Sequence, residues 1–221
     1  MKSIFLKAQD SGWYSEFLKS VVEKIIEDED VHNILDIGTG PGKLLELLIN
    51  QDRTLQITGI DVNTAMIDEA RRRLSNKNVS FQYQKKDEPL GFDDAVFDVI
   101  TFCSVLFLLD NNTKTFLLNE ALRVLKLKGK IIILTPTGDK SILSAFSEVK
   151  TFRFHKYNWT FILWKIFTSI AGRKWQKQKW LEQFFEDKKM NYSISKIFNN
   201  NASIETATKS FPFYKSEKAF R

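Results

Sequence analysis

The stretch ILDIGTGPGKLLELL, residues 34–48, decides the fold. A short apolar run ends at Asp36, three glycines follow at alternate positions, and a leucine-rich helical pattern begins near Lys43. Glycines allow a tight turn and leave no Cβ to block a ligand, and the free N–H groups of a helix N-terminus favour an anionic group. The stretch therefore predicts a strand, a nucleotide-binding loop and a helix.

Alternating strand and helix patterns continue on both sides of this loop. Strands are predicted at 34–37, 55–61, 79–83, 97–103, 129–136, 192–198 and 202–211, and helices at 13–27, 43–50, 65–74, 112–125 and 180–189. Four alternations of strand and helix between residues 34 and 136 imply right-handed βαβ units and a parallel, doubly wound sheet. Ligands of such sheets bind at the carboxyl ends of the strands.

A carboxylate ends the second predicted strand, LQITGID (55–61). Asp61 at this position can accept hydrogen bonds from both hydroxyls of a ribose. The glycines follow the spacing G-x-G-x-G, and Lys43 stands where the NAD fingerprint G-x-G-x-x-G has its last glycine. The pattern therefore favours a nucleoside with free ribose hydroxyls and an anionic group, and it disfavours a nicotinamide enzyme.

LDIGTGPG followed by GID resembles the class I S-adenosylmethionine-dependent methyltransferases. KKDEPLGFDDAVFDVITFCSVLFLL (85–109) and ALRVLKLKGKIIILTP (121–136) are similar to later segments of the same family. The resemblance covers 34–136 well and the C-terminal segment more loosely. It implies an α/β fold: a Rossmann-like, doubly wound, mainly parallel seven-stranded sheet with an inserted helical cap after strand five.

The same resemblance implies where the cofactor, S-adenosyl-L-methionine, binds. Asp36 and the glycine loop would meet its methionine end, and Asp61 would hold the ribose. Val62 and Met66 would flank the adenine, and Asp87 would accept from its amino group, with the backbone of Glu88 nearby. Phe102 and Cys103, at the end of the fourth strand, would line the cofactor. The expected cofactor-binding residues are Asp36, Gly38, Thr39, Gly40, Gly42, Asp61, Val62, Met66, Asp87, Glu88, Phe102 and Cys103.

Methyl transfer from a sulfonium depends mainly on positioning, and a base is needed only if the acceptor must lose a proton. Tyr14 and His155 are the candidate catalytic residues, because the resemblance places their segments beside the acceptor; His155 as a solvated residue of a basic strip is the alternative. Cys103 is interpreted as a small buried apolar residue, since TFCS (101–104) lacks the proline–cysteine pair of RNA cytosine-C5 methyltransferases. One cysteine and two histidines do not suffice for a four-ligand zinc site, so no metal is expected.

The C-terminal third is basic. From residue 150 onward there are 15 Lys/Arg and 5 Asp/Glu, against 18 and 22 before it, and 150–180 holds four of the five tryptophans and no acidic residue. A helix is expected from Asn158 to Gly172. Three interpretations stay open for this segment: a lid packed on the domain, a contact with a membrane surface and an apolar acceptor, or a nucleic-acid site.

One domain is predicted over 1–221. It comprises an N-terminal helical cap (1–30), a cofactor-binding core (31–137), a basic and aromatic cap (138–175) and a final helix with strands (176–221). The single cysteine and the lack of a signal peptide or membrane span predict a cytoplasmic protein, with peripheral membrane contact through 150–180. The expected function is S-adenosylmethionine-dependent methyl transfer to a small, apolar or lipid-like acceptor. An RNA methyltransferase and a non-catalytic binding module are the alternatives.

Overall fold

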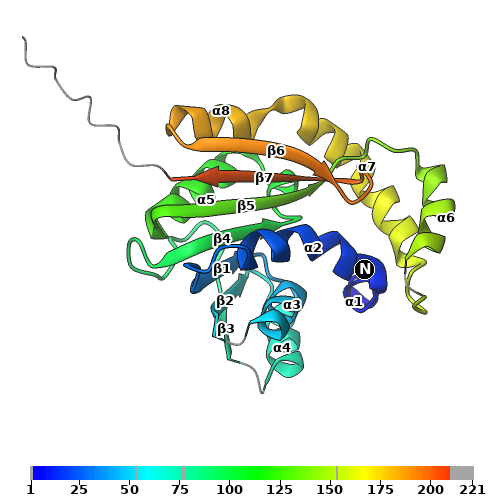
Figure 1. The fold of residues 1–221 in the computed structure, drawn as a ribbon, viewed down its shortest axis with the longest axis horizontal. Helices are drawn as coiled ribbons and strands as arrows, with labels where there is room; N and C mark the ends of the chain where they lie inside the picture. Colours follow the sequence, from blue (N-terminus) through cyan, green and yellow to red (C-terminus); the bar gives the residue numbers. More distant parts are fainter. Residues whose placement is uncertain (1, 53, 76–77, 153, 210–221) are drawn as a thin grey trace, which may run out of the picture.

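The computed structural model describes residues 2–52, 54–75, 78–152 and 154–209, which contain one seven-stranded sheet of order β3-β2-β1-β4-β5-β7-β6 (Figure 1). The first five strands run parallel, and β7 pairs antiparallel with both β5 and β6. The predicted fold class is therefore confirmed. The strands are β1 (Asn33–Ile37), β2 (Gln56–Asp61), β3 (Val79–Tyr83), β4 (Phe97–Cys103), β5 (Leu125–Pro136), β6 (Asn191–Ile197) and β7 (Ala202–Thr208).

Helices cover both faces of the sheet. The helices are α1 (Lys2–Gln9), α2 (Gly12–Ile26), α3 (Lys43–Gln51), α4 (Thr64–Arg73), α5 (Asn111–Val124), α6 (Ala145–Glu148), α7 (Thr160–Gln178) and α8 (Trp180–Asp187), with the 3-10 turns η1 (Leu106–Leu108), η2 (Ile142–Ser144) and η3 (Val149–Thr151). Alternate strand residues face opposite sides of a sheet, so Ile132 packs with α2, α3 and α4, whereas Ile131 and Ile133 pack with α5 and α8.

The inserted helix differs from its predicted bounds. It was expected to span Asn158 to Gly172, but α7 begins at Thr160 and continues through Gly172 to Gln178. A Cβ on Gly172 would lie 2.3 Å from the carbonyl oxygen of Pro136 at the end of β5. This glycine therefore allows close packing of α7 on the sheet and does not end the helix. Two smaller differences are that β5 begins at Leu125 and that the last two residues of the predicted strand 202–211 lie outside the described part of the chain.

The N-terminal helices pack against α7. The indole Nε1 of Trp13 donates a hydrogen bond to Thr160 Oγ1 at 2.9 Å, and the Trp13 ring packs against Phe161 and Trp164 with centroids 5.5 and 5.3 Å apart. The ring of Phe17 contacts Phe198, which precedes β7. Figure 1 shows α1, α6 and the first turns of α7 together at one end of the molecule. Two segments distant in the sequence thus share one aromatic core.

Candidate functional site

Two adjoining cavities lie at the carboxyl ends of β1, β2 and β4. The first has a volume of about 170 Å³ and the second about 150 Å³, and Gly38, Asp61 and Val105 line both. In a doubly wound sheet this is where the chain changes direction across the sheet and where ligands bind. The two cavities therefore form one elongated candidate site.

Asp61 stands where the two cavities meet. Its Oδ2 accepts a hydrogen bond from the backbone N–H of Gly40 at 2.9 Å, and its Oδ1 accepts one from the N–H of Asn63 at 2.8 Å. The Asn63 side chain in turn caps α4 by accepting from the N–H of Ala65. The carboxylate is thus held in a fixed orientation, and each of its oxygens keeps a lone pair for a ligand hydroxyl.

The three loop glycines have separate roles. Gly38, Gly40 and Gly42 have φ values of 77°, 56° and 82°, in the left-handed region that favours glycine. A Cβ on Gly38 would lie 2.3 Å from Val105 Cγ2, so this wall of the site admits no side chain. Gly42 lines neither cavity; it caps the start of α3 and faces Leu74 and Phe81. Only the first two glycines form the site.

The first cavity is lined by titratable groups. Asp36 is 2% exposed, and Thr101 Oγ1 donates to its Oδ1 at 2.6 Å. Burial raises the pKa of Asp36 to about 6. Burial also raises the pKa values of the Tyr14 phenol and the Cys103 thiol, and the Asp36 carboxylate adds to both shifts. At neutral pH the phenol and the thiol are therefore protonated.

Some buried polar atoms beside this cavity lack partners. Gln9 Oε1 and Ser104 Oγ are two such atoms: they are shielded from solvent, and neither has a hydrogen-bond partner within the described residues. Ser104 also has a φ of 61°, an uncommon backbone conformation for a residue with a side chain. Buried polar groups are nearly always paired, so these atoms indicate a polar ligand in the first cavity.

The second cavity is mainly apolar. Its walls include Ile37, Ile60, Val62, Leu109, Phe116 and Leu117. The turn 84–89 forms its polar edge, where Gln84 Nε2 donates to the carbonyl oxygens of Lys85 and Glu88 at 3.0 and 2.9 Å. A largely apolar slot with a few fixed polar groups suits a flat heteroaromatic ring.

Most of the predicted residues line this site. The first cavity is lined by Tyr14, Asp36, Gly38, Thr39, Gly40, Asp61, Met66 and Cys103, and the second by Gly38, Asp61, Val62, Asp87 and Glu88. Val62 and Met66, expected to flank one ring together, line different cavities. Phe102 is fully buried in the core on the α5 side of the sheet. His155 lies beside Tyr157, with ring centroids 5.4 Å apart, and lines neither cavity.

Other lining residues were not predicted. They include Phe5 and Gln9 on α1, Leu18 on α2, Leu44 on α3, Asn63 and Gln84 after β2 and β3, Ser104, Val105 and Leu109 after β4, and Phe116 and Leu117 on α5. The Phe5 ring covers the glycine loop, since a Cβ on Gly40 would lie 3.3 Å from its Cε1. The carboxyl-end rule would have identified Ser104 and Val105, because they directly follow β4.

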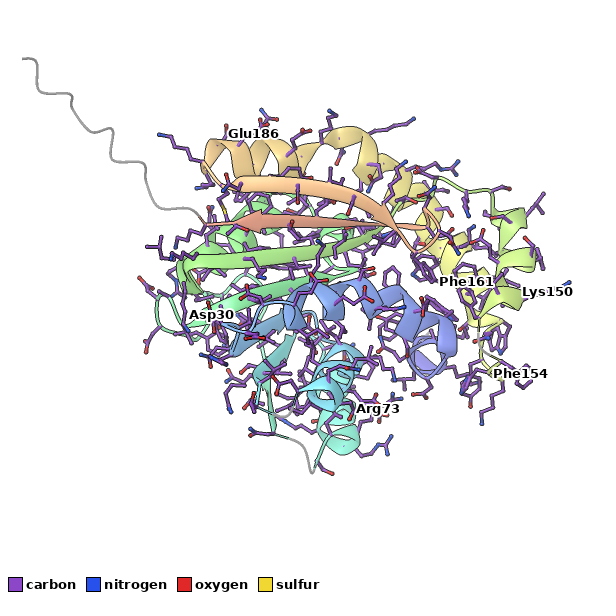
Figure 2. The ribbon with its side chains drawn as sticks, viewed as in Figure 1. Asp30, Arg73, Lys150, Phe154, Phe161 and Glu186 are labelled. Carbon is purple, nitrogen blue, oxygen red and sulfur yellow. The ribbon has the colours of Figure 1, made fainter. Side chains whose placement is uncertain are left out.

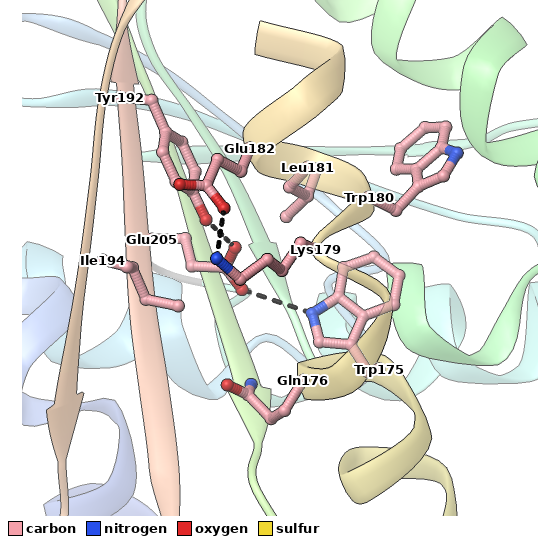
Figure 3. Close-up of a pocket in the computed structure, with 9 residues that line it drawn as sticks. All are labelled: Trp175, Gln176, Lys179, Trp180, Leu181, Glu182, Tyr192, Ile194 and Glu205. Carbon is pink, nitrogen blue, oxygen red and sulfur yellow. Dashed lines mark hydrogen bonds and ion pairs between the residues drawn. The ribbon is translucent and has the colours of Figure 1, made fainter. Parts of the chain in front are cut away.

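A third cavity, of about 160 Å³, lies between α7, α8 and the strands β6 and β7 (Figure 3). Trp175 Nε1 donates to one oxygen of Glu205 at 3.2 Å, and the Tyr192 hydroxyl donates to the other. Burial raises the pKa of this carboxyl. Both oxygens of Glu205 have partners, so the network joins helices to strands and is satisfied within the fold.

Comparisons with known proteins point to one family. The family model described as "Methyltransferase domain" matches residues 34–129. A ubiquinone/menaquinone biosynthesis C-methyltransferase of Desulfotalea psychrophila is 29% identical over 67% of this chain and 57% of its own length. A demethylmenaquinone methyltransferase of Thermotoga maritima is 36% identical over 56% of this chain and 51% of its own length.

The fold is also that of solved methyltransferases. The structure of the plantazolicin methyltransferase BpumL in complex with SAH matches with a TM-score of 0.60 and 20% identity, over 95% of this chain and 85% of that one. The chain spans little more than half the length of the curated relatives it matches. The structural likeness concerns the architecture, and the family model covers β1 to β4 and the loops that follow them.

Proposed function

We propose that this chain, which belongs to the class I S-adenosylmethionine-dependent methyltransferases, binds S-adenosylmethionine across its two joined cavities and methylates a small, apolar acceptor. The observation that carries the proposal is the position of Asp61. Its carboxylate stands between an apolar slot and a polar cavity and is oriented by two backbone N–H groups. A nucleoside with a polar extension needs an apolar slot for its base, an acceptor for its ribose hydroxyls and a polar cavity for the extension, in this order.

The residues of the site fit the cofactor. The apolar cavity between Val62 and Leu109 would hold the adenine, and Asp61 would accept from the ribose hydroxyls. The unpartnered Gln9 Oε1 and the buried Asp36 carboxylate would face the amino-acid portion. When bound, the cofactor supplies an electrophilic methyl group on a good leaving group, so the chain contributes mainly by positioning.

The acceptor side is proposed to be apolar. Phe5, Tyr14, Leu18 and Leu44 add apolar surface to the first cavity beyond the glycine loop. The raised pKa of Tyr14 keeps its hydroxyl protonated at neutral pH, so Tyr14 would orient the acceptor by donating a hydrogen bond and would not act as an anionic base. The names of the two curated relatives concern quinone biosynthesis, which supports an apolar ring compound as acceptor. That His155 also contacts the acceptor remains a prediction.

Calorimetry with S-adenosylmethionine, S-adenosylhomocysteine and NAD tests cofactor binding. We expect binding of the first two and none of NAD; absence of binding by both sulfur compounds would overturn the proposal. Transfer of a labelled methyl group to demethylated quinones and to RNA then tests the acceptor. Label in the organic extract supports a small apolar acceptor, and label in RNA with a steep salt dependence supports the RNA alternative. Tight cofactor binding without transfer to any acceptor supports a non-catalytic module.

A further inference from the structure

A group of large apolar side chains is exposed on the outer side of η2, α6 and α7. Leu143 is 77% exposed, Phe167 is 64% and Ile170 is 76%. Half of the exposed large apolar residues in the described part of the chain belong to this segment. We call the eight residues the apolar patch: Ile142, Leu143, Phe146, Phe154, Trp159, Ile166, Phe167 and Ile170.

Helix α7 carries apolar residues on its exposed side as well as on its buried side. Ile166, Phe167 and Ile170 recur at helical spacing and lie on one exposed face, and the opposite side buries Phe161 and Trp175 together with Lys165, Ser169 and Gly172. Both η2 and α6 contact α7, and they carry the exposed residues Ile142, Leu143 and Phe146. Surface helices normally turn polar residues to solvent, so an exposed apolar stripe on α7 is typical of a contact surface.

The patch is bordered by positive charge. Residues 149–181 contain no Asp or Glu. Exposed basic residues lie beyond both ends of the apolar stripe: Lys150, Lys156, Arg173, Lys174 and Lys177. Figure 2 shows Lys150 and Phe154 pointing outward at the same end of the molecule, whereas Phe161 points into the core. The basic residue within the stripe region, Lys165, is buried and pairs with Glu148 at 3.3 Å.

We propose that the apolar patch and its basic border bind the surface of an anionic lipid bilayer, with α7 lying in the plane of the interface. Aliphatic and aromatic side chains would enter the boundary between headgroups and acyl chains, and lysine and arginine would contact anionic headgroups. None of the helices in the described ranges is long and apolar enough to cross a membrane, so the contact is with one surface. The proposal does not depend on methyl transfer.

Other partners fit this surface less well. In a two-fold dimer the patch would face itself, and the basic borders of two copies would be brought together. Single-stranded nucleic acid would use the positive charge, but bases stack on aromatic rings, and Leu143 and Ile170, which are among its most exposed residues, are aliphatic. A bilayer uses the aliphatic surface and the positive border together.

Co-sedimentation with lipid vesicles, without cofactor, tests the proposal. Vesicles of phosphatidylglycerol and phosphatidylcholine should bind the chain at least roughly tenfold more tightly than phosphatidylcholine alone, and added salt should weaken this binding. Phe167→Glu/Ile170→Glu should reduce binding by about tenfold or more. Leu127→Glu, at an exposed apolar residue of β5, is the matched control and should bind as the unaltered chain does. Thermal unfolding checks that each variant is folded.

A second pair of variants isolates the charge. Lys174→Gln/Lys177→Gln should weaken binding to anionic vesicles about tenfold or more, because each surface charge contributes on the order of 1 kcal/mol near an anionic leaflet. The control, Lys19→Gln/Lys188→Gln, changes one lysine on α2 and one directly after α8. It should not weaken binding to anionic vesicles. Unchanged vesicle binding by the Phe167/Ile170 variant would overturn the proposal. Two other results would also overturn it. The first is a chain that does not bind lipid but forms a dimer that the Phe167/Ile170 variant no longer forms, and the second is RNA binding that requires the patch.

Discussion

The carboxylate of Asp61 accepts a hydrogen bond from the backbone N–H of Gly40 over 2.9 Å. This bond joins the end of β2 to the loop that follows β1, and it adds to the parallel pairing of Ile37 with Ile60. The ligand-binding carboxylate is therefore oriented before any ligand arrives, which lowers the entropic cost of binding.

The first prediction concerns Asp61→Asn. An asparagine keeps the shape of the side chain but replaces one acceptor oxygen by an amide donor, which then faces a backbone N–H or a ribose hydroxyl. We expect the affinity for S-adenosylmethionine to fall about 10- to 100-fold, since a hydrogen bond to a charged group contributes roughly 1.5–3 kcal/mol. Calorimetry measures this. Asp93→Asn, at an exposed carboxylate, is the control; equal affinities of the two variants would refute the role of Asp61.

The second prediction concerns the pH dependence of stability. Burial raises the pKa of Asp36 from its ordinary 3.8 to about 6, so the folded chain binds more protons than the unfolded chain between these values. The free energy of unfolding should therefore fall as pH rises through this range, by up to about 3 kcal/mol from this group. Asp36→Asn should remove that part of the slope and be the more stable form above pH 6.

Urea unfolding between about pH 4.5 and 7.5, without cofactor, measures the difference between Asp36→Asn and the unaltered chain. The shared contributions of all other groups cancel in this difference. The amide oxygen of asparagine can still accept from Thr101. A difference that is flat across the pH range would show that Asp36 titrates as an ordinary carboxylate.

The third prediction concerns Cys103. The raised pKa of its thiol leaves little thiolate at neutral pH, and the thiolate is the nucleophile that attacks alkylating agents. We expect iodoacetamide at about pH 7.5 to modify the folded chain at least roughly 100-fold more slowly than the chain unfolded in urea. The sequence contains one cysteine, so mass spectrometry reads this site without interference. Similar rates in both states would mean that Cys103 is an activated nucleophile.

The fourth prediction concerns Gly172→Ala. The new Cβ would lie 2.3 Å from the carbonyl oxygen of Pro136, so α7 must move away from β5. We expect a loss of roughly 1–3 kcal/mol in the free energy of unfolding. Gly91→Ala is the matched control, because its Cβ would meet nothing within 4 Å. If both variants lose the same free energy of unfolding, the close approach of α7 to Pro136 is not the reason that a glycine is needed at position 172.

The sequence predicted the strands and the core of the site well because both depend on local patterns. Short apolar or alternating runs located β1 to β4 within one residue, and the carboxyl-end rule brought Asp36, Gly38 and Asp61 together. The covering residues depend on tertiary contacts. Phe5 lies over Gly40 because α1 folds back on the glycine loop, and no pattern near Phe5 shows this.

One predicted helix boundary was wrong. Gly172 was interpreted as a helix end because its packing partner, Pro136, lies far away in the chain. Phe102 and Cys103 were both assigned to the cofactor, although neighbours in a strand point to opposite faces of the sheet. In the structure the Cys103 side chain lines the first cavity, whereas the Phe102 side chain packs in the core on the α5 side of the sheet.

The hydrogen bond between Trp13 and Thr160 joins residues 147 positions apart. During synthesis, α2 leaves the ribosome long before Phe161, Trp164 and Phe198, which together cover its aromatic face. Helices α1 and α2 are thus among the last of these elements to reach their final packing, although they are made before the others. In the nascent chain this face is an exposed apolar surface, where a chaperone would bind and where premature termination would leave an aggregation-prone fragment.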